Sequence, residues 1–177
     1  MKPSLLIASP QMRDPNFEKA VILLWHYDEN GAIGVVVNRQ LEHHLPDVLE
    51  ITEVDLSPYA SCAVSWGGPC EPLSGTVVAR SALSGDEGWS LGHDLGVTRN
   101  EDTLRRLLGE SAELMLFLGY AGWGPGQLDE EIADGGWLFT DIETWLLFDT
   151  EPQQRYDLAL KSLGLSRHAM VMPPVEA

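Results

Sequence analysis

Residues 116–128 read LFLGYAGWGPGQL, and this stretch decides how the rest of the chain is interpreted. An apolar run at 114–118 leads into it and predicts a buried strand, and an acidic run at 129–133 follows it and predicts a helix. Glycine permits positive φ angles and close main-chain approach, so we predict a glycine-rich turn between the two. That turn would contain Gly119, Gly122, Gly124 and Gly126. Because a corner needs only one or two glycines, we expect a shaped surface at the end of this strand, where α/β proteins often bind ligands.

The charge balance restricts the classes of partner. The chain has 27 acidic and 11 basic residues, a net charge of −16, and the basic residues are scattered. Duplex DNA would be repelled by this field, so nucleic acid is not the expected partner. No apolar run approaches the length of a transmembrane helix, and the N-terminal segment lacks the apolar core of a signal peptide. We therefore expect a cytoplasmic protein without a membrane span.

The spacing of cysteine and histidine predicts neither a disulfide nor a metal site. Cys62 and Cys70 are the only cysteines, and a reducing compartment disfavours a bond between them. The chain contains no C-x-x-C and no H-x-x-x-H spacing. The sequence therefore indicates no metal ion and no cofactor.

Two continuously apolar segments flank an Asn-Gly pair. Residues 20–26 and 32–38 are predicted strands, and Asn30-Gly31 between them is the strongest short signal for a β-hairpin. Strands that are apolar on both faces need cover on both sides. We therefore expect helices packed outside this hairpin, or a sheet that curls on itself.

The remaining pattern predicts one α+β domain over residues 1–177. Further strands are expected at 3–9, 62–66, 75–80, 114–118 and 137–140, with a short strand pair within 89–98. Helices are expected at 45–49, after the N-cap Asn100, at 127–134 and at 150–164. Residues 166–177 are expected to be a weakly structured tail.

Five segments, in one order and spanning nearly the whole chain, resemble a known family. They are ASPQMRDPNFEKAVILL (8–24), HYDENGAIGVVVNR (26–39), GGPCEPLSG (67–75), GYAGWGPGQLDEEI (119–132) and LLFDTEPQQRYDLALKSLG (146–164). Together they closely resemble the AlgH/YqgE-like family of bacterial proteins, and GYAGWGPGQL is the most specific motif. The resemblance implies a single α+β domain whose bulged, mostly antiparallel sheet curls into a partial barrel with flanking helices. It also implies a regulatory role, once tied to alginate production, without a defined biochemical activity. Where the family commonly has valine after GGP, this chain has Cys70.

The glycine-rich stretch gives the first candidate ligand-binding residues. The spacing Gly122-x-Gly124-x-Gly126 before a helix is similar to a phosphate-binding turn, in which main-chain N–H groups face an anion. It matches neither G-x-G-x-x-G nor a P-loop, and acidic residues 129–131 would oppose a phosphate. The alternatives are a tight structural turn packed by Trp123, or a site for another ligand or partner.

A second turn, Gly67-Gly68-Pro69, also follows a predicted strand. If that strand lies beside 114–118 with its end aligned, the two turns share one rim. The candidates on this rim are Gly67, Gly68, Pro69, Cys70, Gly119, Tyr120, Gly122, Trp123, Gly124, Gly126 and Gln127. Trp123 separates the interpretations, because a structural wedge would be buried and a binding residue would be partly exposed beside a cleft.

Asp14, Asn38 and Arg39 form a second group of candidates, each at a strand end or in an adjoining loop. Arg39 would hold a carboxylate or phosphate through two hydrogen bonds, or would pair with Asp14 as a structural ion pair. Cys70 would be reactive beside a cation and is otherwise an ordinary turn cysteine.

No catalytic residue is assigned, since the chain contains no G-x-S-x-G motif or local nucleophile arrangement. The leading hypothesis is a non-enzymatic regulatory module that binds a small ligand or a protein. The alternative is an enzyme with its site between the 67–70 and 119–127 loops; a DNA-binding regulator is disfavoured by the charge. A deep pocket with a perturbed acid or base would favour catalysis, and a shallow apolar surface would favour binding. The sequence leaves the ligand, the pathway and the oligomeric state open.

Overall fold

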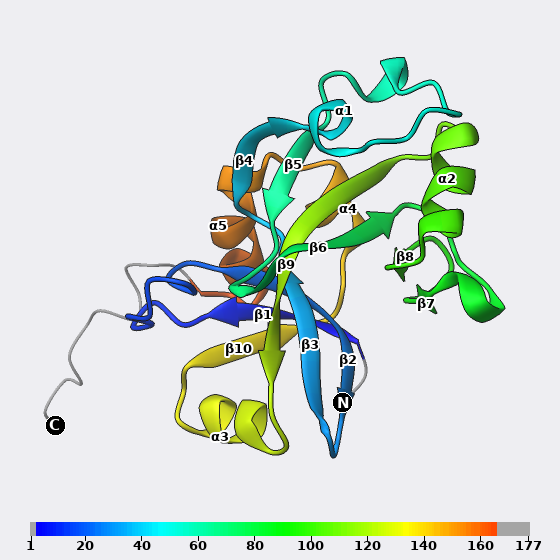
Figure 1. The fold of residues 1–177 in the computed structure, drawn as a ribbon. Helices are drawn as coiled ribbons and strands as arrows, with labels where there is room; N and C mark the ends of the chain where they lie inside the picture. The colour runs from blue at the N-terminus through cyan, green and yellow to red at the C-terminus, as the bar shows by residue number, and fades with distance from the viewer. Residues whose placement is uncertain (1–2, 166–177) are drawn as a thin grey trace, which may run out of the picture.

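Strand β9 (Leu114–Trp123) is the element around which the fold is built (Figure 1). Along one edge it pairs antiparallel with β6 (Cys70–Ala79). Along the other edge it pairs first in parallel with β5 (Ala63–Trp66) and then antiparallel with β3 (Gly31–Val36). The computed structural model describes residues 3–165, and within them β9 joins two groups of strands into one sheet.

The ten strands of the described residues form an open sheet. The other strands are β1 (Ser4–Ala8), β2 (Val21–Asp28), β4 (Gln40–His44), β7 (Trp89–Ser90), β8 (Gly96–Thr98) and β10 (Trp137–Thr140). The path through the sheet is β10-β1-β2-β3-β9-β6-β8-β7, and β4 is attached through β5. Register shifts interrupt the β2–β3, β4–β5 and β6–β9 pairs, and only β5–β9 is parallel. The expected bulged, mostly antiparallel α+β fold is confirmed, and the sheet does not close.

The predicted hairpin is confirmed, and its burial is uneven. Asn30-Gly31 joins β2 to β3, with Asp28 opposite Gly31. Residues 21–25 are buried, because the side chains of this part of β2 pack into an apolar core of the protein. His26 and Asp28 are exposed, since the tip of the hairpin extends beyond that core.

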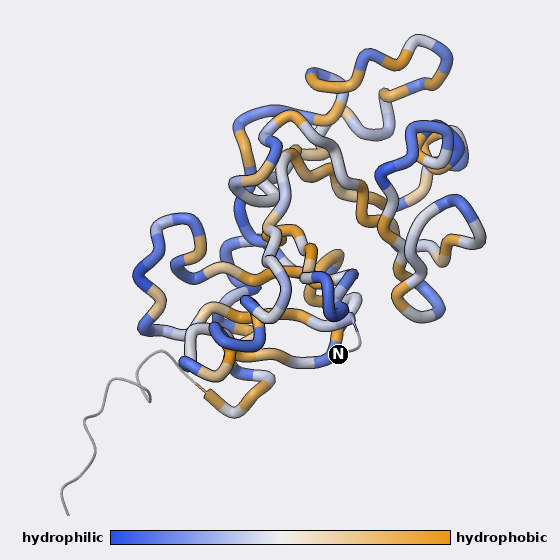
Figure 2. Tube along the Cα trace, turned by 60° about the horizontal axis from the view of Figure 1, so that its bottom comes forward, coloured by the Kyte–Doolittle hydropathy of each residue, from blue (hydrophilic) through white to orange (hydrophobic). Residues whose placement is uncertain are grey.

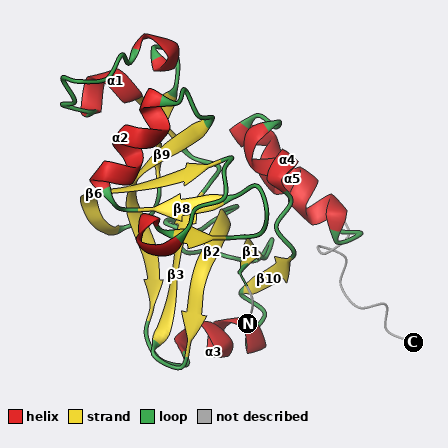
Figure 3. Cartoon of the chain, turned by 90° about the vertical axis from the view of Figure 1, so that its right-hand side faces the viewer, coloured by secondary structure: helices red, strands yellow, loops and turns green. Residues whose placement is uncertain are grey.

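Five helices of the described residues cover the sheet. They are α1 (Leu45–Val48), α2 (Glu101–Gly109), α3 (Gln127–Ala133), α4 (Thr144–Phe148) and α5 (Pro152–Ser162). Helices α1 and α2 lie on one side of the sheet, α4 and α5 lie on the other, and α3 lies near the tip of the β2–β3 hairpin (Figures 1 and 3). The predicted helix after Asn100 is α2, and the Asn100 side chain accepts hydrogen bonds from the N–H groups of Asp102 (2.8 Å) and Thr103 (3.2 Å). The predicted tail at 166–177 lies outside the described residues.

Two apolar cores lie on opposite faces of β9. Leu114 and Leu116 pack into the core beneath α2, while Met115 and Phe117 pack into the core around β1 and β2. This alternation follows from the period of two in a strand, in which successive side chains point to opposite faces. Figure 2 shows apolar segments concentrated along the central strands and hydrophilic residues on the outer turns. Between residues 3 and 165, no helix has both the length and the hydropathy needed to cross a bilayer.

Candidate functional site

The two glycine segments predicted to share a rim lie against each other. β5 and β9 are parallel neighbours, with Trp66 opposite Leu118. Directly beyond this pair, the N–H of Gly67 donates to the carbonyl of Leu118 (2.7 Å), and Cys70 lies opposite Tyr120. We call the contact between residues 67–70 and 119–120 the β9 crossing.

Main-chain atoms fill the β9 crossing. A Cβ atom on Gly67 would lie 2.3 Å from the carbonyl oxygen of Gly119, and one on Gly68 would lie 2.2 Å from the carbonyl carbon of Tyr120. Gly119 has a φ of +76°, and a Cβ there would lie 2.3 Å from the carbonyl oxygen of Gly68. These glycines are needed for the approach of two main chains. Backbone atoms therefore occupy the junction of the two segments at which the alternative hypothesis placed an enzyme site.

The prediction that the central strand ends at Leu118 is wrong. β9 continues to Trp123, so Gly119 and Gly122 lie within a strand and only residues 124–126 form the turn before α3. The extra length pairs with β3, where Ile33 lies opposite Gly122. Glycine permits a close contact between strands as readily as it permits a turn. At Gly119 the close strand contact explains why the residue is glycine.

Asn38 fastens the 14–19 loop to the sheet. Its Oδ1 accepts a hydrogen bond from the N–H of Val21 (2.9 Å), and its Nδ2 donates to the carbonyl of Lys19 (2.8 Å). From its position just beyond β3, the side chain therefore satisfies main-chain groups at the start of β2 and just before it.

Arg39 has a similar role on the same loop. Its guanidinium donates to the carbonyls of Asn16 (2.6 Å) and Glu18 (2.8 Å) and lies 5.0 Å from the ring centroid of Trp66. Partial burial lowers the pKa of Arg39. The Asp14 carboxylate accepts from the N–H of Asn16 (2.9 Å). The hydrogen bonds of Arg39 thus go to the main chain of this loop. The sequence had suggested the Asp14 carboxylate as one possible partner.

Trp123 is packed as a wedge among aromatic rings. It is 6% exposed, it stacks on Phe17 with centroids 6.3 Å apart, and it meets Trp137 edge to face at 6.0 Å. Its Nε1 donates to Oε2 of Glu131 (3.0 Å). The Oε1 of Gln127 accepts from the N–H of Gly124 (3.0 Å), which holds the turn before α3.

Four of the predicted site residues meet at one cavity beside this wedge. Asp14, Gly122, Trp123 and Gln127 line an opening of about 270 Å³. The structure therefore divides the predicted residues among the closed β9 crossing, the Asn38–Arg39 fastening, the 124–126 turn before α3 and this cavity.

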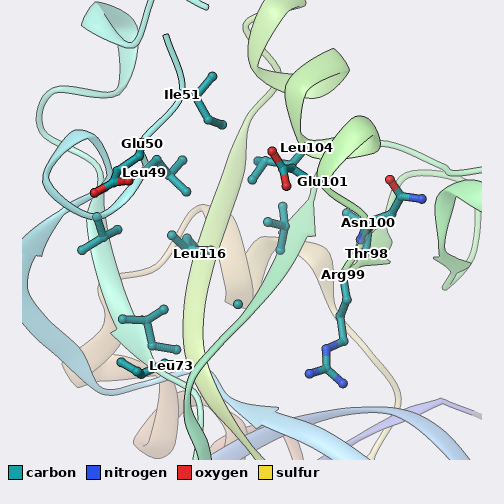
Figure 4. A pocket seen from close by; sticks show the side chains of 14 residues that line it. Leu49, Glu50, Ile51, Leu73, Thr98, Arg99, Asn100, Glu101, Leu104 and Leu116 are labelled. Carbon is teal, nitrogen blue, oxygen red and sulfur yellow. Dashed lines mark hydrogen bonds between the residues drawn. The ribbon is translucent and has the colours of Figure 1, made fainter.

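Sequence reasoning missed a separate apolar opening, which we call the α2 groove. It has a volume of about 410 Å³ and lies between α2 and the segment that follows α1 (Figure 4). Its apolar lining comes from four segments: Val48, Leu49, Ile51, Leu73, Val77, Leu104, Leu116 and Leu118. Leu73 lines the groove and is 94% exposed.

One cation, Arg99, lines the α2 groove, together with the two carboxylates Glu50 and Glu101. The guanidinium of Arg99 lies 5.2 Å from the ring centroid of Tyr120 and 3.5 Å from a carboxylate oxygen of Glu71, and it donates to the hydroxyl of Ser74. The Arg99 and Glu71 side chains are 33% and 64% exposed, so this ion pair is solvated and weak. Through Tyr120, Arg99 connects the groove to the β9 crossing.

The buried Arg155 and the half-buried Cys62 lie outside the groove and the crossing. Burial lowers the pKa of Arg155 to about 10, and its guanidinium donates to the carbonyls of Leu147 (2.6 Å) and Thr150 (3.0 Å). Burial also raises the pKa of the Cys62 thiol. Both side chains line a separate opening of about 510 Å³. The main-chain partners of Arg155 indicate a structural clamp on the start of α5.

The family follows from comparison with known proteins. Residues 5–168 match the AlgH-like family. This chain belongs to the AlgH-like family. A UPF0301 protein of Paracoccus denitrificans is 43% identical over 169 residues, which cover 91% of this chain and 88% of the relative. The solution structure of AlgH from Pseudomonas aeruginosa superposes with a TM-score of 0.77 at 31% identity, covering 99% of this chain and 95% of that one.

A protein from Corynebacterium diphtheriae shares the fold, with a TM-score of 0.75 at 22% identity over 91% of this chain and 86% of that one. The sequence resemblance and the fold that it implied are thus confirmed. The AlgH-like family is uncharacterised, and the names of these relatives assign no biochemical activity.

Proposed function

We propose that the chain is a binding module that acts in regulation, and that its ligand occupies the α2 groove. The observation behind this proposal is an open pocket of about 410 Å³, lined by eight apolar and five polar side chains, with an almost fully exposed leucine, Leu73, at its edge. Pockets of this size with mostly apolar walls and a few polar groups are typical of small-molecule sites. The closed β9 crossing, in contrast, offers no comparable space.

The proposed ligand has an elongated apolar body and one anionic head group. The apolar body would cover Leu104, Leu116 and Leu118, which removes apolar surface from water. The head group would replace Glu71 at Arg99, because that existing ion pair is exposed and long at 3.5 Å. A carboxylate is the simplest group that fits this guanidinium.

Regulation would follow from the position of the groove between α2 and the segment that follows α1. Leu104 lies on α2, and Leu49 and Ile51 follow α1. A ligand between them would hold α2 and the 49–51 segment together. A protein partner would recognise the ligand-bound arrangement of these two elements. Binding is favoured over catalysis because the groups whose pKa values are displaced by burial, among them Arg155 and Cys62, do not line the groove.

Decanoate and 1-decanol are the probes that test this proposal, with isothermal titration calorimetry as the measurement. We expect saturable binding of decanoate and about tenfold weaker binding of the uncharged alcohol, the loss of one charge-assisted contact. Arg99→Gln should weaken decanoate alone, and Leu73→Ser should weaken both probes. Phe139→Ser is the matched control, because Phe139 is a half-exposed apolar residue that does not line the groove.

Absence of saturable binding of either probe, or an equal loss in the Phe139→Ser variant, would contradict the proposed site. Equal affinity for decanoate and decanol would reject the anionic head group. The net charge of −16 supports the further proposal that duplex DNA is not a partner. Tight, salt-sensitive retardation of a DNA fragment by the pure protein would contradict it.

A further inference from the structure

A second cavity, about 270 Å³ in volume, lies where the 12–17 loop meets the start of α3 and the start of β10. We call it the Glu131 pocket. Its lining combines three aromatic rings, Phe17, Trp123 and Trp137, with three carboxylates, Asp14, Glu131 and Asp134. This combination is absent from the α2 groove, so the inference below is independent of the proposed function.

The Glu131 carboxylate is fixed by neutral donors. Its Oε2 accepts from Nε1 of Trp123 (3.0 Å) and from Nε1 of Trp137 (2.8 Å), and its Oε1 accepts from Nε2 of Gln127 (2.9 Å). A carboxylate offers about four lone-pair positions, so these three bonds leave acceptor capacity on Oε1. Indole and amide N–H groups orient the carboxylate but do not neutralise its charge.

Three aromatic rings form walls of the cavity, and Phe17 is the most exposed of them. Phe17 meets Trp137 edge to face with centroids 5.5 Å apart, and Trp123 contacts both rings. Trp123 and Trp137 are 6% and 2% exposed, so packing fixes the ring positions. The faces of tryptophan and phenylalanine rings carry negative potential, and a cation within about 6 Å of a ring centroid is stabilised.

Positive charge is missing from the lining of the Glu131 pocket. None of the described residues that line it is lysine, arginine or histidine, although three carry carboxylates. Arg39 interacts electrostatically with Asp14, but its guanidinium donates to main-chain carbonyls and it does not line the cavity. A cation of matching size would therefore be attracted by the carboxylates and by the rings together.

The spacing of the carboxylates selects the kind of cation. Among the described residues, no group of three or more histidine, cysteine or acidic side chains converges closely enough to hold a metal ion. A cavity with separated carboxylates and apolar ring walls suits an organic cation, whose charge is spread over a larger apolar surface. We propose that the Glu131 pocket binds an organic ammonium group of the quaternary, trimethylated type.

Choline is the probe that tests this inference, and 3,3-dimethyl-1-butanol, its uncharged isostere, is the ligand control. We expect choline to change tryptophan fluorescence in a saturable way and to bind at least about tenfold more tightly than the alcohol, an energy consistent with a partly desolvated cation–π contact plus a carboxylate. Equal affinities, or no saturable response to choline, would overturn the proposal.

Three variants locate the site. Glu131→Gln should weaken choline binding about tenfold, and the double change Asp14→Asn with Asp134→Asn should weaken it several-fold. Asp14 and Asp134 are exposed, so the double variant keeps the test valid if Glu131→Gln fails to fold. Glu130→Gln is the matched control, because Glu130 is an exposed acidic residue on α3 that does not line the pocket. A loss in Glu130→Gln equal to that in Glu131→Gln, or a loss in the double variant no larger than two such single losses combined, would overturn the assignment, since only the net charge would then matter.

Discussion

The β9 crossing and the α2 groove are built by the same strand pair, β6 and β9, and differ in how closely the two strands approach. At the crossing, Cys70 lies opposite Tyr120, and main-chain atoms leave no room for a Cβ atom on Gly68 or Gly119. The pairing is then interrupted and resumes only where Gly75 meets Leu118. The four residues between the two pairs bulge away from β9 and expose Leu73 beside the groove. A β-bulge thus separates a closed scaffold from an open pocket within one pair of strands.

Alanine substitution at Gly119 in the crossing and at Gly75, where the pairing resumes, should give the largest difference. Gly119→Ala places a Cβ atom 2.3 Å from a carbonyl oxygen and requires a positive φ, so we expect a loss of roughly 3 kcal/mol or more in the free energy of unfolding. At Gly75 the new Cβ atom would lie 3.6 Å from Leu116, so Gly75→Ala should stay within about 1 kcal/mol of wild type. Urea denaturation measures both, and equal losses would break the comparison.

Trp123→Phe tests whether the scaffold continues beyond the crossing. The change removes the indole N–H that donates to Glu131 and part of the packing on Phe17 and Trp137. We expect a loss of about 2 kcal/mol, the usual cost of removing one hydrogen-bond partner from a buried group together with some packing. Trp145→Phe is the control, since Trp145 is 42% exposed and should cost little. Similar stabilities of the two variants would show that Trp123 is no wedge.

The far end of β6 is held by exposed charges, and its stability should depend on pH. The two NH groups of Arg80 donate to the two carboxylate oxygens of Asp149 (2.9 and 2.6 Å), and these hydrogen bonds lower the pKa of Asp149. A carboxyl with a lowered folded-state pKa contributes stability above its unfolded pKa, near 3.9, and loses that contribution as the pH falls through the folded value.

The melting temperature of wild type should therefore fall more between pH 5 and pH 3 than that of Asp149→Asn. Glu29→Gln at the exposed hairpin tip removes one acidic charge elsewhere and should keep the wild-type pH dependence. Identical pH profiles of wild type and Asp149→Asn would show that this ion pair adds nothing to the end of β6.

The smallest effect on stability should come from the bulge itself. Leu73→Ser should change the free energy of unfolding by less than about 0.5 kcal/mol, because Leu73 is 94% exposed and buries little surface on folding. The same substitution is expected to weaken ligand binding in the groove. Thermal denaturation beside the decanoate titration separates the two readouts, and a large loss of stability would place Leu73 in the scaffold.

The sequence predicted the elements that local chemistry specifies. Asn30-Gly31 between two apolar runs predicted the hairpin, and Asn100 predicted the start of α2. The polar strand β4 escaped prediction because its residues are mostly exposed and it is held by main-chain pairing to β5. The length of β9 was misjudged because glycine has the same local signature in a turn and in a close strand contact.

The α2 groove could not be predicted, because its lining comes from four distant segments and no local pattern marks it. The Glu131 pocket was predicted only in part. Gln127 and Trp123 belong to the glycine motif, but no local pattern marks Glu131 as their shared partner. Side chains that meet through tertiary packing leave little trace in the spacing of a single sequence.

The central claim is that the α2 groove binds ligand while the β9 crossing only positions it. The most direct test is a titration of the ¹⁵N-labelled protein with decanoate, followed by amide chemical shifts. We expect saturable shifts at Leu73, Arg99 and Leu104, on the edge and walls of the groove, with much smaller shifts at Gly67 and Gly68. Shifts centred on residues 67–68 and 119–120, or no saturable shifts at all, would contradict the account.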